Sequence, residues 1–273
     1  MKSKEVTIKT KHHFHKWLLF VLIISLFGCD FSPVIQSEIL IAQQYLADQK
    51  YEKAVATYEN IIKTNPSQLI KIKIYYQLGE LYSIYLLNGL KARENYENIK
   101  ENTEDLVWKI KAEEKLAELN FSLLKDFKAA KKNYEKLVSF EPKLSNQDFY
   151  ENRLGLANLN DGDIAKSLEL FTKISKQPNH KYYTESFFNL GLTMFQDRKW
   201  EEAIKYWLEF LKRANKSSKT IETKFLIGNA YESMEKLKEA YEFYYTILNE
   251  YPNPAVIKSR LNNIYSRRIA RKR

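Results

Sequence analysis

A small residue followed four positions later by an aromatic residue recurs six times along this chain. The pairs are Ala54/Tyr58, Ala92/Tyr96, Ala130/Tyr134, Ser167/Phe171, Ala203/Trp207 and Ala240/Tyr244. Successive small residues are 38, 38, 37, 36 and 37 positions apart. Positions four apart share one face of an α-helix, and a period of this length indicates a repeat array. We therefore expect stacked copies of one small helical unit.

A second small residue precedes each pair at a nearly constant distance. It stands 12 positions earlier at Ala42, Gly155, Gly191 and Gly228, and 13 positions before Ala92 at Gly79. We expect Gly89 to absorb this extra residue in a turn, whereas in the third unit Ala117 leaves the register ambiguous by one position. Small residues on two antiparallel helices let the axes approach to about 8–10 Å or less. The aromatic residue is expected to fill the space against the next hairpin.

This pattern resembles the tetratricopeptide repeat. The best copies are Ala42-x-x-Tyr45…Ala54…Tyr58…Pro66 and Leu226-Ile227-Gly228-x-x-Tyr231…Ala240…Tyr244…Pro252. The resemblance implies an all-α, right-handed superhelical solenoid of about six helix-turn-helix repeats. They would span about 35–68, 72–105, 110–143, 148–181, 184–217 and 221–252. The alternative, a generic helical bundle, does not predict a small residue at a fixed distance from each aromatic residue.

After the last repeat, residues 253–273 are predicted to form a capping helix with a basic tail. Asn253 and Pro254 form an N-cap followed by proline in the first turn. The face expected to pack holds Val256, Ile257, Leu261, Ile264 and Tyr265. We expect the basic tail to be solvated, and the alternative is contact with anionic lipid head groups.

The N-terminus has the features of an export signal. Five lysines precede an apolar run of 12 residues, 17–28, which is shorter than the roughly 18 residues that span a bilayer. Leu26-Phe27-Gly28-Cys29 resembles the lipobox of bacterial lipoproteins, although Phe27 replaces the usual smaller residue. The resemblance implies a signal peptide at 1–28, a lipidated (palmitate-bearing) Cys29 and a short tether at 29–34. An uncleaved signal anchor is the alternative.

Charge and chemistry exclude several classes of function. The net charge is +10, but residues 29–257 hold 32 basic and 33 acidic side chains, so nucleic-acid binding is disfavoured. His180, beside Pro178 in a connector, is expected at the surface of a turn. We expect Asp161-Gly-Asp163 to form a turn rather than a calcium loop. No pattern predicts a metal, a cofactor or catalysis.

A binding surface is the remaining possibility. In tetratricopeptide arrays the first helix of each unit lines a groove, and this resemblance implies a set of groove residues here. They are Ile39, Gln43, Tyr76, Glu80, Phe149, Asn152, Leu156, Phe188, Leu192, Phe195, Phe225 and Asn229. Aromatic side chains on such a wall suit an apolar peptide or helix. The competing interpretation is that some of them pack between repeats.

These features predict a lipid-anchored scaffold of the bacterial envelope that faces the periplasm or the exterior. Its layout is similar to the repeat lipoproteins of outer-membrane β-barrel assembly and to the pilotins of type IV pili. A regulator that docks cell-wall enzymes is the alternative, and an enzyme with an undetected site is the third hypothesis. Asp30, after Cys29, leaves the choice between inner and outer membrane open.

Overall fold

The computed structural model describes residues 33–215 and 218–271. Within these ranges the chain forms helices and no β-strand, which confirms the all-α prediction. The predicted signal peptide, Cys29 and most of the tether lie outside the described residues. Among the described helices, none combines the length and the hydropathy needed to cross a bilayer.

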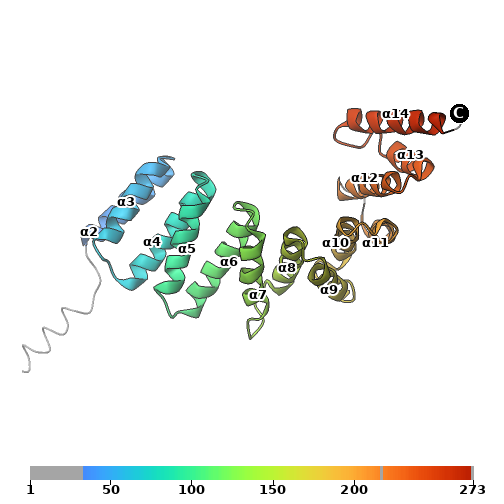
Figure 1. Cartoon of the computed structure of the whole chain (residues 1–273). Coiled ribbons are helices and arrows are strands. Elements are labelled where there is room, and N and C mark those ends of the chain that lie inside the picture. Colours follow the sequence, from blue (N-terminus) through green and yellow to red (C-terminus); the bar gives the residue numbers. More distant parts are fainter. Residues whose placement is uncertain (1–32, 216–217, 272–273) are drawn as a thin grey trace, which may run out of the picture. The chain divides into compact units, whose positions relative to one another are not determined.

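The helices alternate as first and second members of antiparallel hairpins (Figure 1). The first helices are α2 (Pro33–Ala47), α4 (Gln68–Glu80), α6 (Leu106–Ser122), α8 (Gln147–Asp161), α10 (Tyr183–Gln196) and α12 (Ser218–Ser233). The second helices are α3 (Tyr51–Lys63), α5 (Gly89–Glu101), α7 (Phe127–Val138), α9 (Ile164–Ile174), α11 (Trp200–Arg213) and α13 (Leu237–Thr246). Each predicted repeat interval overlaps one helix of each kind, but every first helix begins one to four residues before its predicted interval.

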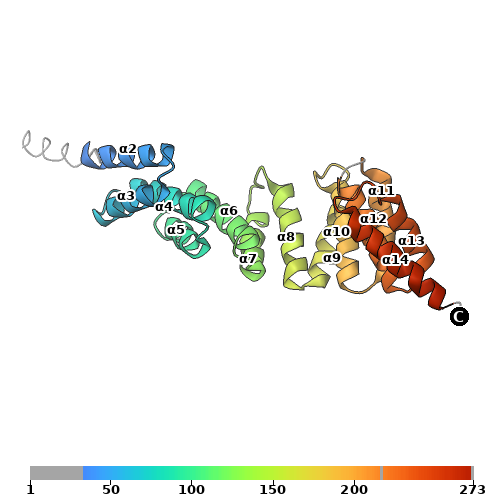
Figure 2. The ribbon, with the colours of Figure 1, turned by 90° about the horizontal axis from the view of Figure 1, so that it is seen from above.

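The chain divides into two compact units, Met1–Ala112 and Glu113–Arg273, and α6 spans the division. Unit 1 holds the first two hairpins and the beginning of α6, and unit 2 holds the rest. Figure 2 shows α14 (Pro254–Ala270) lying along α12 and α13 at the end of unit 2.

In the four hairpins whose first helix carries a glycine, the second helix presses its aromatic residue onto that glycine. Built on Gly155 or Gly228, a Cβ would lie 2.6 Å from the ring of Phe171 or Tyr244, respectively. Trp207 covers Gly191 in the same way, and its Nε1 donates to the carbonyl of Phe188 at 3.1 Å. The aromatic residue thus closes its own hairpin, a contact that adds to the expected packing against the next element.

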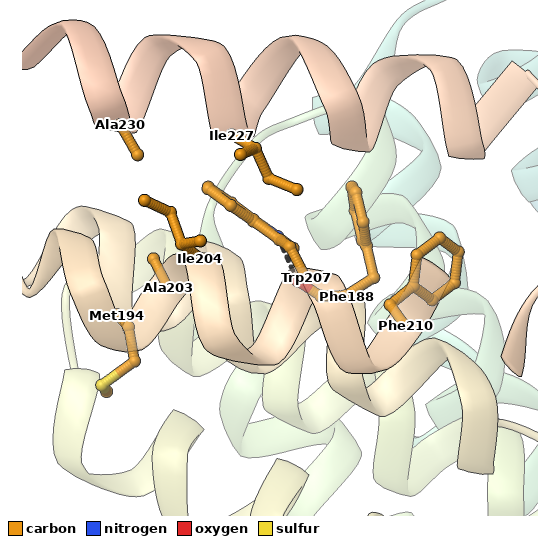
Figure 3. Close-up of a cluster of buried hydrophobic side chains, with 8 residues drawn as sticks. All are labelled: Phe188, Met194, Ala203, Ile204, Trp207, Phe210, Ile227 and Ala230. Atoms are coloured by element: carbon orange, nitrogen blue, oxygen red, sulfur yellow. Dashed lines mark hydrogen bonds between the residues drawn. The ribbon is translucent and has the colours of Figure 1, made fainter. Parts of the chain in front are cut away.

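Trp207 also joins two hairpins. In the cluster drawn in Figure 3, Ile227 and Ala230 of α12 lie over Trp207 and Ile204 of α11. All four side chains are buried. Because one ring contacts the glycine below and the next hairpin above, the intra-hairpin and inter-hairpin contacts share a single side chain.

The turn inside every hairpin holds one residue with positive φ. These residues are Gln49, Leu87, Lys125, Gly162, Arg198 and Glu235, with φ between 50° and 84°. Each lies five positions before the small residue of its second helix, so the turn repeats with the same spacing as the packing. Only the fourth turn uses glycine, the residue for which the left-handed conformation carries no steric cost.

The second repeat absorbs its extra residue in a π-helix. Leu81–Tyr85 follows α4 directly with the wider π turn, and the amide of Asn88 donates to the carbonyl of Tyr82 at 2.7 Å. The corresponding bonds in the first and fifth turns span one residue fewer, as in Lys50 to Tyr45. The extra residue is therefore placed before the turn and not, as expected, at Gly89, which begins α5.

The capping helix buries a narrower face than the sequence predicts. Ile257, Leu261 and Ile264 pack on Leu237, Ala240, Tyr244 and Ile247 of the preceding hairpin. Val256 and Tyr265 are 37% and 61% exposed, because each is rotated by about 100° beyond the edge of the packed stripe. Asn253 accepts a hydrogen bond from the amide of Ala255 at 3.2 Å, as an N-cap does.

Replacing Gly191 by Ala is expected to destabilise the protein. The added methyl would overlap the indole of Trp207, and overpacking costs about 1–3 kcal/mol, which outweighs the helix-propensity gain of about 1 kcal/mol. Urea denaturation followed by circular dichroism measures the change. Thr184→Ala on the same helix is the control and should change little. A Gly191→Ala variant as stable as the wild type would contradict the close ring contact.

Replacing Leu87 by Gly is expected to stabilise the protein by about 0.5–1 kcal/mol, because glycine adopts positive φ without strain. Leu87 is 67% exposed, so little packing is lost. Leu90→Gly is the matched control: Leu90 is 70% exposed but lies within α5, where glycine costs about 1 kcal/mol. Thermal denaturation should shift in opposite directions for the two variants, and shifts of the same sign would refute this account of the turn.

Candidate binding surface

The residues predicted to line a groove differ in accessibility. In unit 1, Tyr76 is half-buried, with its ring edge against Trp108 at a centroid distance of 5.9 Å. In unit 2, Phe149, Phe195, Phe225 and Asn229 are also half-buried. These side chains expose part of their surface on the first helices.

Two of the predicted groove residues are buried, and the prediction is corrected for them. Asn152 of α8 accepts a hydrogen bond from Asn189 Nδ2 of α10 at 3.1 Å. Phe188 is 4% exposed and packs on Phe210 with ring centroids 5.5 Å apart. Both side chains serve the joints between helices, which is the competing interpretation that the sequence left open.

Internal contacts also limit two of the remaining aromatic side chains. Phe225 stacks on Tyr251 at a centroid distance of 4.9 Å. Phe149 faces the guanidinium of Arg153 at 5.2 Å, and the same guanidinium lies 4.5 Å from the ring of Phe121. The exposed edges of these rings are therefore held in place by neighbouring side chains before any partner arrives.

A depression lies on the first-helix side of unit 2, near its C-terminal end. We call it the C-terminal depression; it is lined by Phe195, Asn229, Glu232, Ser233, Arg260 and Arg267. These residues come from α10, α12 and α14, so the capping helix supplies its last wall. Two of the lining residues, Phe195 and Asn229, belong to the predicted groove.

Glu232 organises the charges around this depression. Its carboxylate accepts hydrogen bonds from Arg267 at 2.9 Å, Arg260 at 3.3 Å and the hydroxyl of Tyr244 at 3.1 Å. The Tyr244 hydroxyl also donates to Asn229 Oδ1 at 2.6 Å, and burial raises the pKa of this phenol. Polar groups from all three last helices thus converge on a single carboxylate that is 13% exposed.

Part of the basic tail is consequently paired rather than solvated. Arg267 donates to Glu235 at 2.6 Å, and Arg271 forms an ion pair with the same carboxylate. The hydrogen bond from Arg267 is the main cause that holds the pKa of Glu235 below its usual value. The prediction of a solvated tail is therefore incomplete: Arg267 is half-buried and paired, and Arg271 is paired while its side chain stays 55% exposed. The signal was the spacing of Arg260 and Arg267, seven positions apart on one face.

His180 is a second correction, since it is buried and does not lie at the surface of a turn. Its side chain is 2% exposed, and Nε2 lies 3.6 Å from both Asp148 Oδ1 and Glu151 Oε2. Nδ1 accepts the amide hydrogen of Tyr182 at 3.0 Å. The imidazole thus fills the connector between α9 and α10 and ties it to α8, a tertiary role that a lone histidine in a sequence does not reveal.

Several charged and phenolic side chains of the described residues take part in structural contacts. No group of acidic, histidine or cysteine side chains in the described ranges is arranged to hold a metal ion. Asp163, in the predicted turn of the fourth repeat, caps α9 by accepting from the amide of Lys166 at 3.3 Å. Tyr150 has its pKa raised to about 12 by burial and by its hydrogen bond to Glu114, so this phenol stays protonated at neutral pH.

Comparison with known proteins identifies the repeats. One tetratricopeptide-repeat family model matches residues 221–254, and another matches 38–67 and 185–217. The chain carries tetratricopeptide repeats. Arrays of tetratricopeptide repeats are generally scaffolds for protein interaction. No curated protein matches this tetratricopeptide chain in sequence.

Solved structures share the fold of this tetratricopeptide array. PilW, described as a widely conserved type IV pilus biogenesis factor, matches with a TM-score of 0.55 and 16% identity over 85% of this chain and 98% of its own. PilF of Pseudomonas aeruginosa matches with a TM-score of 0.51 and 13% identity, over 85% and 97% of the two chains. PH0952 of Pyrococcus horikoshii, a signal transduction ATPase with a tetratricopeptide repeat sensor, matches with a TM-score of 0.58 and 17% identity. The match covers 84% of this chain and 38% of its own.

Replacing Glu232 by Gln is expected to loosen α14 from the last tetratricopeptide repeat. The variant removes the charge that pairs with Arg260 and Arg267, and a charge-assisted hydrogen bond contributes about 1.5–3 kcal/mol. Hydrogen exchange of residues 254–270 measures the opening of the helix. Glu209→Gln is the matched control, because Glu209 pairs with Lys212 and Arg213 within α11. Equal exchange of α14 in both variants would contradict the role of Glu232.

Proposed function

We propose that this tetratricopeptide protein is a lipid-anchored scaffold of the bacterial cell envelope that binds segments of partner proteins on its first-helix side. The observation that carries the proposal is the C-terminal depression. It combines an aromatic ring, Phe195, with an amide and two guanidinium groups that remain 32% and 46% exposed. A peptide with an apolar side chain next to a carboxylate or a carbonyl group matches these groups.

The envelope location is supported by the N-terminal sequence. The charged segment, the apolar run at 17–28 and Cys29 follow one another as in a bacterial lipoprotein signal. Cys29 is the only cysteine of the chain, and it stands directly after the apolar run. Anchoring through Cys29 would place the repeats close to a membrane, because the first described helix, α2, starts at Pro33, four positions after Cys29 in the sequence.

Assembly of an envelope structure is the setting that we propose for this scaffold. PilW and PilF match over nearly their whole length, and PilW is described as a type IV pilus biogenesis factor. Their identities of 16% and 13% support the shared fold, and the pilus is therefore one candidate beside outer-membrane protein assembly. Docking of cell-wall enzymes is the alternative that the experiment below must separate from both.

Photo-cross-linking in intact cells tests this function. A photo-reactive phenylalanine analogue replaces Phe195 in the C-terminal depression. Tyr245, which is 62% exposed on α13, is replaced in the control. We expect adducts with pilus or outer-membrane assembly proteins from position 195 and none from position 245. Adducts with wall hydrolases would favour the docking regulator, and equal adducts from both positions would refute a binding role for the depression.

The same cells test the anchor. Wild-type protein should incorporate labelled palmitate and fractionate with membranes, whereas the Cys29→Ser variant should do neither. The variant should also lose the adducts from position 195, because the scaffold no longer lies beside its partners. An unlabelled wild type, or a variant that is processed and anchored as before, would overturn the lipoprotein part of the proposal.

A further inference from the structure

Unit 1 contains a cavity of about 400 Å³ that shares no residue with the predicted groove. Its walls come from α3 and α5, the second helices of the first two repeats, and α4 and the π-helix supply the rest of its lining. Sites for small ligands commonly measure about 300–1,000 Å³. We call this cavity the unit 1 pocket. The C-terminal depression belongs to unit 2, so the two sites are built from separate residues.

The π-helix places Tyr82 in the unit 1 pocket. The side chain of Tyr82 is buried, and its hydroxyl donates to Glu59 Oε1 of α3 at 2.7 Å. The same hydroxyl accepts from Lys91 Nζ of α5 at 3.2 Å, and this ammonium lies 4.9 Å from the ring centre. Tyr82 therefore links the two walls of the pocket. Single π-helical turns within α-helices occur frequently at functional sites.

The third repeat closes the corresponding place by a direct hydrogen bond. Tyr82 and Asn95 each stand three positions after the small residue of their helix, and the equivalent residues of the third repeat are Asn120 and Asn133. Asn120 Nδ2 donates to Asn133 Oδ1 at 2.9 Å. In the second repeat, Tyr82 donates to the preceding hairpin instead, and Asn95 Nδ2 donates to the carbonyl of Lys91 in its own helix at 2.8 Å.

The fifth and sixth repeats fill the same place with packed side chains. In the sixth repeat the equivalent residues, Tyr231 and Phe243, stack with ring centroids 5.7 Å apart. In the fifth they are Met194, which is buried, and Tyr206, which packs against the same apolar cluster. Hairpin packing alone therefore favours contact between these two positions. The second repeat departs from this rule and has a pocket there.

The unit 1 pocket carries charges of both signs in equal number. Glu59 and Lys63 lie one turn apart on α3, and Lys91 and Glu94 lie about one turn apart on α5. The hydrogen bond to Tyr82 is the main cause that raises the pKa of Lys91, and the charges of Glu59 and Glu94 add to it. Both carboxylates thus act on one ammonium group, which neutralises only one of them. Lys63 supplies the second positive charge one turn beyond Glu59.

We propose that the unit 1 pocket binds a small zwitterion, a free amino acid with an apolar side chain. The ligand ammonium pairs with the carboxylates of Glu59 and Glu94, which share a single lysine between them. The ligand carboxylate accepts hydrogen bonds from Lys63 and from the amide of Asn98, which also lines the pocket. A ligand with one charge would leave half of these groups without a partner, whereas a zwitterion pairs with both kinds.

The apolar part of the lining accounts for the side chain of the ligand. Leu78 of α4 is 2% exposed, and Ile62 of α3 is half-buried. Both line the pocket between its charged groups, and covering them with a branched aliphatic side chain removes apolar surface from water. L-Leucine combines such a side chain with the two charged groups. The proposal needs neither the lipid anchor nor a peptide in the C-terminal depression.

Equilibrium dialysis of the full chain against tritiated L-leucine tests the proposal. We expect saturable binding of one leucine per chain. Two unlabelled analogues serve as competitors: 4-methylpentanoate lacks the ammonium group, and 3-methylbutylamine lacks the carboxylate. Each should compete about tenfold more weakly than L-leucine or worse, because each loses charge-assisted hydrogen bonds. Absence of saturable binding would overturn the proposal, and so would an analogue that competes as well as L-leucine.

Substitutions locate the binding site. Glu94→Gln and Lys63→Gln should each weaken leucine binding about tenfold or more. Glu97→Gln is the matched control, because Glu97 is exposed on α5 and does not line the pocket. Thermal denaturation by circular dichroism confirms that each variant is folded. Unchanged binding in both pocket variants, or an equal loss in the control, would contradict the assignment.

A further variant separates this site from the proposed peptide surface. Arg260→Gln alters the C-terminal depression and should bind L-leucine like the wild type. Loss of leucine binding in this variant would place the amino acid in the depression and overturn the unit 1 pocket. Normal leucine binding in a chain that forms no adducts from position 195 would leave the pocket standing without the peptide-binding function.

Discussion

The contact between an aromatic ring and a glycine, which four of the hairpins share, is the interaction on which this fold depends. The rings of Phe171, Trp207 and Tyr244 occupy the volume that a Cβ would take on the facing glycine, so each pair of helices is held at one distance. The same rings are among the most deeply buried side chains of the chain. In the fifth repeat the ring also receives the next hairpin, and the stacking of repeats then follows from the closure of each one.

Electrostatics acts where this apolar packing ends. The capping helix buries three aliphatic side chains, Ile257, Leu261 and Ile264, on the last repeat. Glu232 and Glu235 add ion pairs to three arginines of that helix. Glu232, Arg260 and Arg267 also line the C-terminal depression. The residues that attach the capping helix therefore also form part of the candidate binding surface.

The fold could be predicted from the sequence because it repeats, whereas the site could be predicted only in part. The spacing between Gly191 and Trp207 recurs between Gly155 and Phe171 and between Gly228 and Tyr244. A repeated local spacing of this kind can be recognised in the sequence and predicts the hairpin. Asn152 and Phe188 occupy the register of a groove, yet their burial depends on which neighbour reaches them, which a helical period does not encode. His180 lacked any signal, since its partners Asp148 and Glu151 lie about 30 positions away. The paired arginines lie a similar distance from Glu232.

The left-handed turns are positions at which the stability of the protein can be increased. Five of the six turn residues have a side chain where glycine would be relaxed, and these positions are far apart in sequence. Effects at separate sites add to within a few tenths of a kcal/mol. The array therefore offers a route to greater heat resistance, one hairpin after another, that leaves the interior of every repeat as it is. Stabilising substitutions are therefore best placed at these turn residues and not in the core.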